Sequence, residues 1–200
     1  MLVVISQPHT VPEEAEIING LFDAGMELFH LRRPGETKEK LEALLKKIND
    51  RYYPRIVLHQ QHELGSKFNI NRMHFTEVYR LRQSEESLRQ LVEEGQILST
   101  SVHLPGDLHA LLPVYSYSFL GPLFGSISKP GYTGRIPPGY SLLPGEHKVR
   151  PVALGGIDES NIGLVRAKNF TAAALLGAVW LRANPLDSFR KLQQLWKQAE

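Results

Sequence analysis

The stretch that decides the fold reads Leu120-Gly121-Pro122-Leu123-Phe124-Gly125-Ser126-Ile127-Ser128-Lys129-Pro130-Gly131, a short apolar run that opens into glycine, serine and one lysine. Two later apolar runs, residues 151–154 and 171–176, are also followed by glycine. Glycine at a strand exit lets backbone N–H groups approach an anion, and a following helix adds the positive end of its dipole. The three exits together predict a phosphate-binding cup. Its expected members are Ser126, Ser128, Lys129, Gly155, Gly156 and Gly177.

Short apolar runs rich in β-branched or aromatic residues recur along the chain, and helical patterns lie between most of them. This alternation predicts parallel strands, and eight strands predict a closed α/β barrel, the single (β/α)8 or TIM barrel. An open doubly wound sheet is the alternative, but it places a glycine-rich turn after its first strand. Here that position reads Ser6-Gln7-Pro8-His9. The expected strands cover residues 2–5, 28–31, 56–58, 73–75, 97–98, 117–120, 152–154 and 173–176.

Helices are expected where apolar residues follow a helical spacing between capping residues. Thr37 is the expected N-cap of the second helix, Asp158 starts the helix after strand seven, and Pro185 is the first residue of the last helix. Residues 129–149 hold prolines and glycines without apolar periodicity, so the helix between strands six and seven is expected to be reduced or missing. This segment is either a functional lid or a shortened connection. The helical patterns cover residues 13–24, 37–50, 84–94 and 158–168, with a last helix from residue 184.

Composition narrows the class of protein. A length of 200 residues fits one domain over 1–200, and 42% hydrophobic residues suffice for a sizeable core. The net charge of +2 is spread along the chain, which argues against a nucleic-acid partner. Cysteine is absent, so disulfides and thiolate chemistry are excluded. With no membrane-spanning stretch and no room for a signal peptide before the first apolar run, we expect a cytoplasmic protein. The oligomeric state stays open, a homo-oligomer included.

Several motifs stand in the same order as in one known family. The late-strand motifs are Gly121-Pro122-Leu123-Phe124, Ser128-Lys129-Pro130-Gly131 and Leu154-Gly155-Gly156-Ile157. The early-strand motifs are His30-Leu31-Arg32-Arg33-Pro34, Met73-His74-Phe75 and Ser99-Thr100-Ser101-Val102-His103. Together they resemble the thiamine phosphate synthase and TenI family, whose members are single (β/α)8 barrels that handle the thiazole phosphate half of thiamine. The resemblance spans strands two to eight.

The resemblance implies that the phosphate-binding residues of the family site are preserved. Ser126, Ser128 and Lys129 stand where the family binds phosphates, and hydroxyl donors with a lysine charge suit that task. The resemblance also places the backbone of Gly155, Gly156 and Gly177 against the thiazole phosphate. It keeps the guanidinium of Arg32 and the hydroxyl of Ser101 in the site. The implied partner is therefore a small molecule, thiazole phosphate, with hydroxymethylpyrimidine diphosphate as a second candidate.

The magnesium-binding residues of the family site are replaced in this chain. In the synthases an Asn-Asp pair ends strand three and holds magnesium, whereas this chain has His59-Gln60. A second magnesium aspartate falls near Tyr79, and Glu77 is the acid close by. Magnesium needs anionic oxygen ligands, for which imidazole and amide are poor substitutes. We therefore expect no metal and no cofactor, unless the chain is a working synthase, in which case magnesium is needed.

Three functions remain open. The leading one is a TenI-like, magnesium-independent tautomerase that moves a proton on thiazole phosphate. Its catalytic candidates are His59 and His30, because adjacent strand ends place them at the barrel mouth and a histidine with a pKa near neutrality suits proton transfer. The alternatives are an atypical thiamine phosphate synthase, which joins hydroxymethylpyrimidine diphosphate to thiazole phosphate, and a non-catalytic binder. Both histidines also fit as polar fillers of a vacated magnesium site. His74 and His103 are expected to be structural, and a zinc site built from these histidines is a further option.

Overall fold

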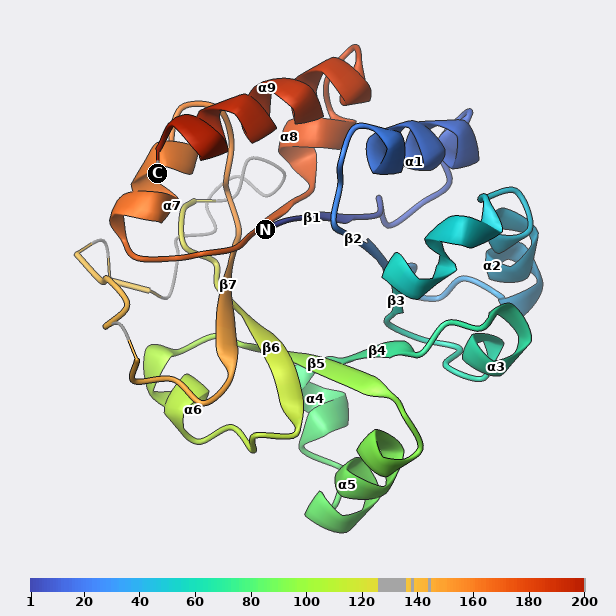
Figure 1. Cartoon of the computed structure of the whole chain (residues 1–200), viewed down its shortest axis with the longest axis horizontal. Coiled ribbons are helices and arrows are strands. Elements are labelled where there is room, and N and C mark those ends of the chain that lie inside the picture. The colour runs from blue at the N-terminus through green and yellow to red at the C-terminus, as the bar shows by residue number, and fades with distance from the viewer. Residues whose placement is uncertain (126–135, 138, 144, 200) are drawn as a thin grey trace.

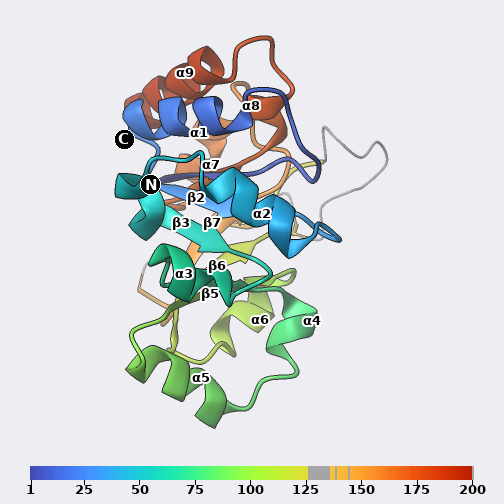
Figure 2. The same ribbon diagram turned by 90° about the vertical axis from the view of Figure 1, so that its right-hand side faces the viewer.

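The chain folds into a closed barrel of eight parallel strands surrounded by helices, as a computed structural model shows (Figures 1 and 2). The structure describes residues 1–125, 136–137, 139–143 and 145–199. Each strand pairs with its sequence neighbours, and β1 closes the ring by pairing with β8. The expected TIM barrel is therefore confirmed. The strands are β1 (Leu2–Ile5), β2 (Leu28–Leu31), β3 (Ile56–Leu58), β4 (Arg72–Phe75), β5 (Ile97–Val102), β6 (Tyr115–Leu120), β7 (Arg150–Leu154) and β8 (Ala173–Leu175).

The longer helices lie where the sequence pattern predicts them. The side chain of Thr37 caps α2 by accepting from the N–H of Lys40, and Asn184 caps α9, which has Pro185 as its first residue. These helices are α1 (Glu14–Asp23), α2 (Lys38–Leu45), α5 (Glu85–Glu93), α7 (Ile162–Ala167) and α9 (Pro185–Gln198). Short helices without a sequence signal are α3 (Leu64–Phe68), α4 (Glu77–Arg80), α6 (Pro105–His109), α8 (Gly177–Trp180) and a 3-10 helix at Asp50–Arg55.

Two helices differ from their expected bounds. The pattern predicts a helix to residue 50, but α2 ends at Leu45 and the chain turns, although Ile48 still packs in the core. Asp158 is not the N-cap of α7. Its carboxylate accepts from the N–H of Ser160 in a turn, and the helix begins only at Ile162. In both places local turn bonds replace the helical ones that the pattern predicts.

Between β6 and β7, the described residues contain no helix, as expected. They are residues 121–125, 136–137, 139–143 and 145–149, and part of this segment packs against the barrel through Ile136 and Leu142. The described part therefore serves as a packed connection without a regular element.

The strands bury side chains on both faces, which gives the molecule two apolar layers. Leu2 and Val4 face the outer layer between barrel and helices, whereas Val3 and Ile5 face the barrel interior. Large side chains from β6 and two alanines at β8, Ala174 and the preceding Ala172, lie in this interior together with aliphatic residues of the other strands. Its buried members are Val3, Ile5, Leu28, Val57, Tyr117, Phe119, Val152, Ala172 and Ala174. Among the described residues, no helix is both long and apolar enough to cross a membrane.

Candidate functional site

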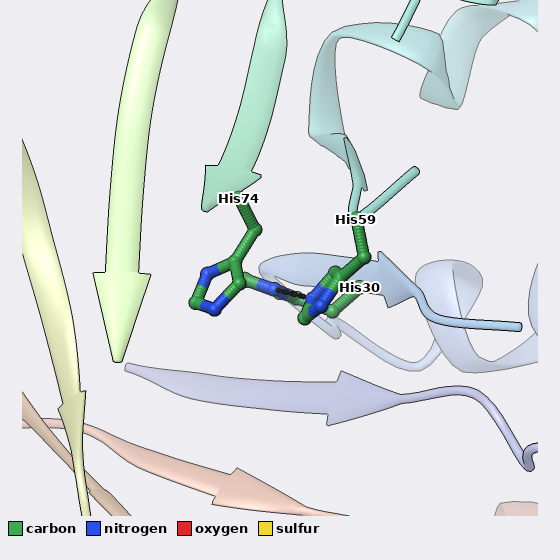
Figure 3. A group of neighbouring side chains, drawn as sticks. All are labelled: His30, His59 and His74. Carbon is green, nitrogen blue, oxygen red and sulfur yellow. Dashed lines mark hydrogen bonds between the residues drawn. The ribbon is translucent and has the colours of Figure 1, made fainter. Parts of the chain in front are cut away.

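Three histidines gather at the carboxyl ends of neighbouring strands (Figure 3). His30 is near the end of β2, His59 directly follows β3, and His74 is near the end of β4. Nδ1 of His30 lies 2.9 Å from Nε2 of His59, so the two rings share one proton. The rings of His59 and His74 stack with centroids 4.1 Å apart. The carboxyl ends of the barrel strands are where TIM barrels carry their active sites.

Buried hydroxyl groups hold two of these rings in place. The hydroxyl of Tyr117 on β6 lies 2.7 Å from Nε2 of His30, at full burial. Ser99 and Ser101 on β5 contact the two nitrogens of His74 at 2.9 and 2.8 Å. Hydrogen bonds on the far nitrogens fix ring orientation and tautomer. The expectation that His74 is hydrogen-bonded within the barrel agrees with these contacts.

His59 is the member of the group that lies nearest to the mouth. His30 and His74 are buried, whereas His59 is half-buried. Its Nδ1 has no hydrogen-bond partner among the described residues, although the atom itself is buried. A buried polar atom without a partner is costly and points to a missing hydrogen-bonding or coordinating group.

Burial keeps the three imidazoles neutral. Desolvation lowers the pKa of His30 and of His59 well below the ordinary value, with the nearby His74 adding to the effect. Desolvation, with His62 and Arg32 contributing, lowers the pKa of His74 to about 3. Near neutral pH each ring therefore carries one N–H and one lone pair that can accept a hydrogen bond or bind a metal. The near-neutral pKa expected of a catalytic histidine is not found at His30 or His59, because burial disfavours the charged ring.

The loops that follow β6 and β7 are joined by backbone contacts. The N–H of Leu123 donates to the carbonyl of Leu154 at 2.8 Å, and that of Phe124 donates to the carbonyl of Gly155 at 3.1 Å. Gly155 and Gly156 both have positive φ, 99° and 64°. A Cβ at Gly156 would lie 2.2 Å from the carbonyl oxygen of Gly125. The conformation of this loop pair therefore requires glycine at both positions, whether or not a ligand binds.

Gly177 differs from that pair. It is the first residue of α8, its φ is not positive, and an added Cβ would meet its nearest neighbour, Leu181, at an ordinary 3.4 Å. The fold therefore does not require glycine at 177. In this four-residue helix the N–H groups of Val179 and Trp180 already donate to the carbonyl of Leu176, which limits any anion contact at this helix start to the N–H groups of Gly177 and Ala178.

The remaining residues that were expected to bind substrate do not form one group in the structure. Arg32 is exposed just after β2, close enough for its charge to lower the pKa of His59 and of His74. Ser101 contacts His74 and is thus part of the histidine group. Ser126, Ser128 and Lys129 lie outside the described residues.

At the positions that the resemblance assigns to magnesium, this chain has an amide at Gln60 and, near Tyr79, the neighbouring acid Glu77. Gln60 follows His59 at the end of β3, and Glu77 opens α4, 3.9 Å from both Arg80 and His103. Within the described part of the chain, the group of His, Cys, Asp or Glu that could hold a metal ion consists of His30, His59 and His74. It contains no carboxylate, so it does not suit magnesium.

Sequence reasoning missed the part played by Tyr117 and Ser99. The pattern predicts Tyr117 as a member of a buried strand and gives Ser99 only as part of a family motif. In the structure Ser99 contacts His74 from the neighbouring strand, and Tyr117 contacts His30 from across the barrel. The sequence does carry a signal for these contacts. Hydroxyl groups stand at inward-facing positions of β5 and β6, and a buried hydroxyl group needs a hydrogen-bond partner inside the barrel.

The fold and site define a TIM barrel with a histidine group and glycine-rich late loops at its mouth. Residues 1–179 match the profile of the TMP-TENI family, described as thiamine monophosphate synthase. The chain therefore belongs to this family, as its motifs indicate. Curated proteins gave no match.

Solved structures agree with this assignment. The chain is similar to thiamine phosphate pyrophosphorylase from Bacteroides thetaiotaomicron, with 25% identity, a TM-score of 0.74 and coverage of 100% of this chain and 98% of that one. The Pyrococcus furiosus thiamine phosphate pyrophosphorylase shares the fold at 13% identity, TM-score 0.75 and coverage of 99% and 96%. So does 3-hexulose-6-phosphate synthase from Salmonella typhimurium, at 14% identity, TM-score 0.66 and full coverage of both chains.

Proposed function

We propose that this chain binds thiazole phosphate and moves a proton on it without magnesium, as a TenI-like tautomerase. The observation that carries the proposal is the position of His59. It directly follows β3, next to Gln60, which stands where the synthases hold magnesium with an acid, and it is hydrogen-bonded to the buried His30. A proton carrier thus lies beside a magnesium position that has lost its acid.

The histidine pair supplies the acid–base chemistry. A tautomerase removes a proton from one atom of its ligand and returns it to another, so it needs a base that keeps the proton for a short time. His59 is neutral, and its Nδ1 is the nitrogen that His30 leaves free. A turn of the half-buried ring brings that nitrogen to a ligand in the mouth. Since His30 has no exposed surface, it acts as a positioning residue that passes or holds the shared proton.

The late loops supply the grip on the phosphate. Backbone N–H groups at Gly177 and in the turn at Gly155 and Gly156 face the same end of the barrel as the histidines, with Lys129 as the proposed counter-charge. Arg32 adds a positive charge on the other side of the mouth. Binding and proton transfer are therefore assigned to different strands, and substitutions should separate them.

The reaction is tested by incubating the protein with thiazole phosphate isomers, with and without hydroxymethylpyrimidine diphosphate, magnesium and chelator. We expect isomerisation that is unaffected by chelator. Formation of thiamine phosphate only when magnesium is present would instead support the atypical synthase. Binding without turnover in every mixture would support the non-catalytic binder.

Substitutions test the assigned roles. His59→Ala is expected to lower the isomerisation rate about a hundredfold to ten-thousandfold, the usual effect of removing a general acid or base, at nearly unchanged affinity. Lys129→Ala should weaken binding before it changes the rate. Steady-state kinetics with a ligand thermal-shift titration measures both quantities. Full activity in His59→Ala would refute the catalytic role of that residue.

A further inference from the structure

The three histidines also have the arrangement of a metal site. One ring nitrogen from each of His30, His59 and His74 lies within 4.8 Å of the other two (Figure 3). Two ligand nitrogens of a tetrahedral zinc ion lie about 3.3 Å apart, given Zn–N bonds of about 2.0–2.1 Å. The separation of 2.9 Å between His30 and His59 is close to that value. Closing the site therefore needs only a small movement of His74 toward the pair.

The outer contacts of two of the three rings, His30 and His74, fit metal ligands, whereas Nδ1 of His59 has no such partner among the described residues. Metal-binding histidines donate their second N–H to a neighbouring acceptor, which fixes the tautomer. The hydroxyl of Tyr117 is this acceptor for His30, and the hydroxyl of the buried Ser99 is the acceptor for His74. The half-buried Ser101 contacts the other nitrogen of His74, and its hydroxyl has to move away before that nitrogen can bind a metal. Phe119 packs against the rings of His30 and His74 at 4.7 and 4.9 Å and gives the site an apolar wall.

The donor set selects the class of metal. Neutral imidazole nitrogens bind zinc and neighbouring transition metals, whereas magnesium and calcium need oxygen ligands. Three ligands leave the fourth position of a tetrahedral ion open, toward the mouth, where His59 and Ser101 are half-exposed.

We propose that His30, His59 and His74 bind one divalent transition-metal ion of the zinc type, with an open coordination position that faces the barrel mouth. The ion replaces the proton that His30 and His59 share. A bound ion would take the two nitrogens between which the pair shares its proton and would hold the His59 ring in place, so the loaded protein should isomerise its ligand more slowly. The binding itself does not rest on the proposed function.

Cobalt is the probe, because tetrahedral Co²⁺ with nitrogen ligands absorbs strongly in the visible range. Chelator-treated full-length protein is titrated with Co²⁺, and we expect one ion per chain with a tetrahedral spectrum that added Zn²⁺ abolishes. Tyr117→Phe removes an outer partner and should weaken Co²⁺ binding about 10–100-fold. His59→Ala removes a ligand and should weaken Co²⁺ binding by more than that. His62→Ala is the matched control. That ring is also half-buried beside the group and contacts the carbonyl of Leu58 at 3.1 Å, but is not one of the three ligands.

Two results would overturn the inference. One is the absence of stoichiometric binding by the wild-type protein. The other is equal binding by wild-type, His59→Ala and His62→Ala proteins, which would place the ion elsewhere. Circular dichroism of each variant shows whether it is folded, and His59→Ala, at the half-buried position, keeps the test usable if variants of the buried histidines do not fold. These readouts use no thiazole ligand, so their failure is separate from failure of the proposed isomerisation.

Discussion

At the scale of single residues, the unusual feature of this barrel is a group of neutral imidazoles in its interior. A buried polar side chain is tolerated only when it is hydrogen-bonded, and His30 and His74 meet that condition through Tyr117, His59, Ser99 and Ser101. His59 meets it in part, because its Nδ1 has no partner among the described residues. The histidine whose hydrogen bonding is incomplete is thus the one nearest to the barrel mouth.

These rings make the stability of the fold depend on pH. Burial depresses the folded-state pKa of His30 and of His74, the latter to about 3, whereas an unfolded histidine titrates near about 6.5. The unfolded state therefore binds more protons below about pH 6.5. Stability is fully present above that pH and falls as the pH is lowered, by about 1.4 kcal/mol per pH unit for each such histidine.

Urea unfolding of chelator-treated protein between about pH 7.5 and 5 measures this slope. The variant His74→Gln keeps polar contacts for Ser99 and Ser101 but has no titrating ring. The change of its unfolding free energy with pH should therefore be smaller by the contribution of one histidine. An unchanged slope in His74→Gln would show that this ring does not contribute.

At the scale of elements, the two loops after β6 and β7 act as one unit. Backbone hydrogen bonds from Leu123 and Phe124 join them, and the close contact between Gly156 and Gly125 leaves no room for a side chain. Glycine at 155 and 156 is thus explained by backbone conformation alone. Gly177, at the start of α8, has no such requirement, so it is the position at which phosphate binding can be tested without disturbing the fold.

Substitution at the two kinds of glycine should have opposite effects. Gly156→Ala is expected to destabilise the protein by at least about 1–3 kcal/mol, because it adds a strained φ and a contact with the Gly125 carbonyl. Gly177→Asp should fold normally, since an acid suits the first turn of a helix, but should repel a bound phosphate and weaken binding at least tenfold. Unfolding and ligand titrations measure the two effects.

Gly163→Asp is the matched control for the added charge, because that residue is an exposed glycine in the first turn of α7 with open space around it. Equal ligand affinity in Gly177→Asp and Gly163→Asp would contradict a phosphate at the start of α8.

At the scale of the whole molecule, ring closure depends on the sizes of the inward side chains. Ala172 and Ala174, next to β1, add small side chains to the interior cluster that also holds the large side chains of Tyr117 and Phe119 from β6. Barrel interiors are packed as tightly as other protein cores, so extra volume there forces the strands apart. The small residues at β8 thus offset the volume of the large side chains of β6 in the same cluster.

Ala174→Leu should therefore cost about 1–3 kcal/mol through overpacking of the barrel interior. Ala167→Leu, at an exposed position of α7, is the control and should change stability by less than about 0.5 kcal/mol. Both are measured by urea unfolding with the midpoint and the slope compared. Similar midpoints for the two variants would show that the interior has unused space.

The sequence by itself determined the barrel and the family. Local periodicity placed all eight strands, because two-sided burial demands apolar runs, and proline and glycine marked the missing helix between strands six and seven. Short helices such as α4 and α6 had no signal, since only tertiary contacts stabilise so few turns. The tertiary structure decided the pairing of His30 with His59 and with Tyr117, and the contacts of His74 with the two serines. Ring closure brings residues 87 positions apart into hydrogen-bond contact, and no local pattern in the chain encodes that distance.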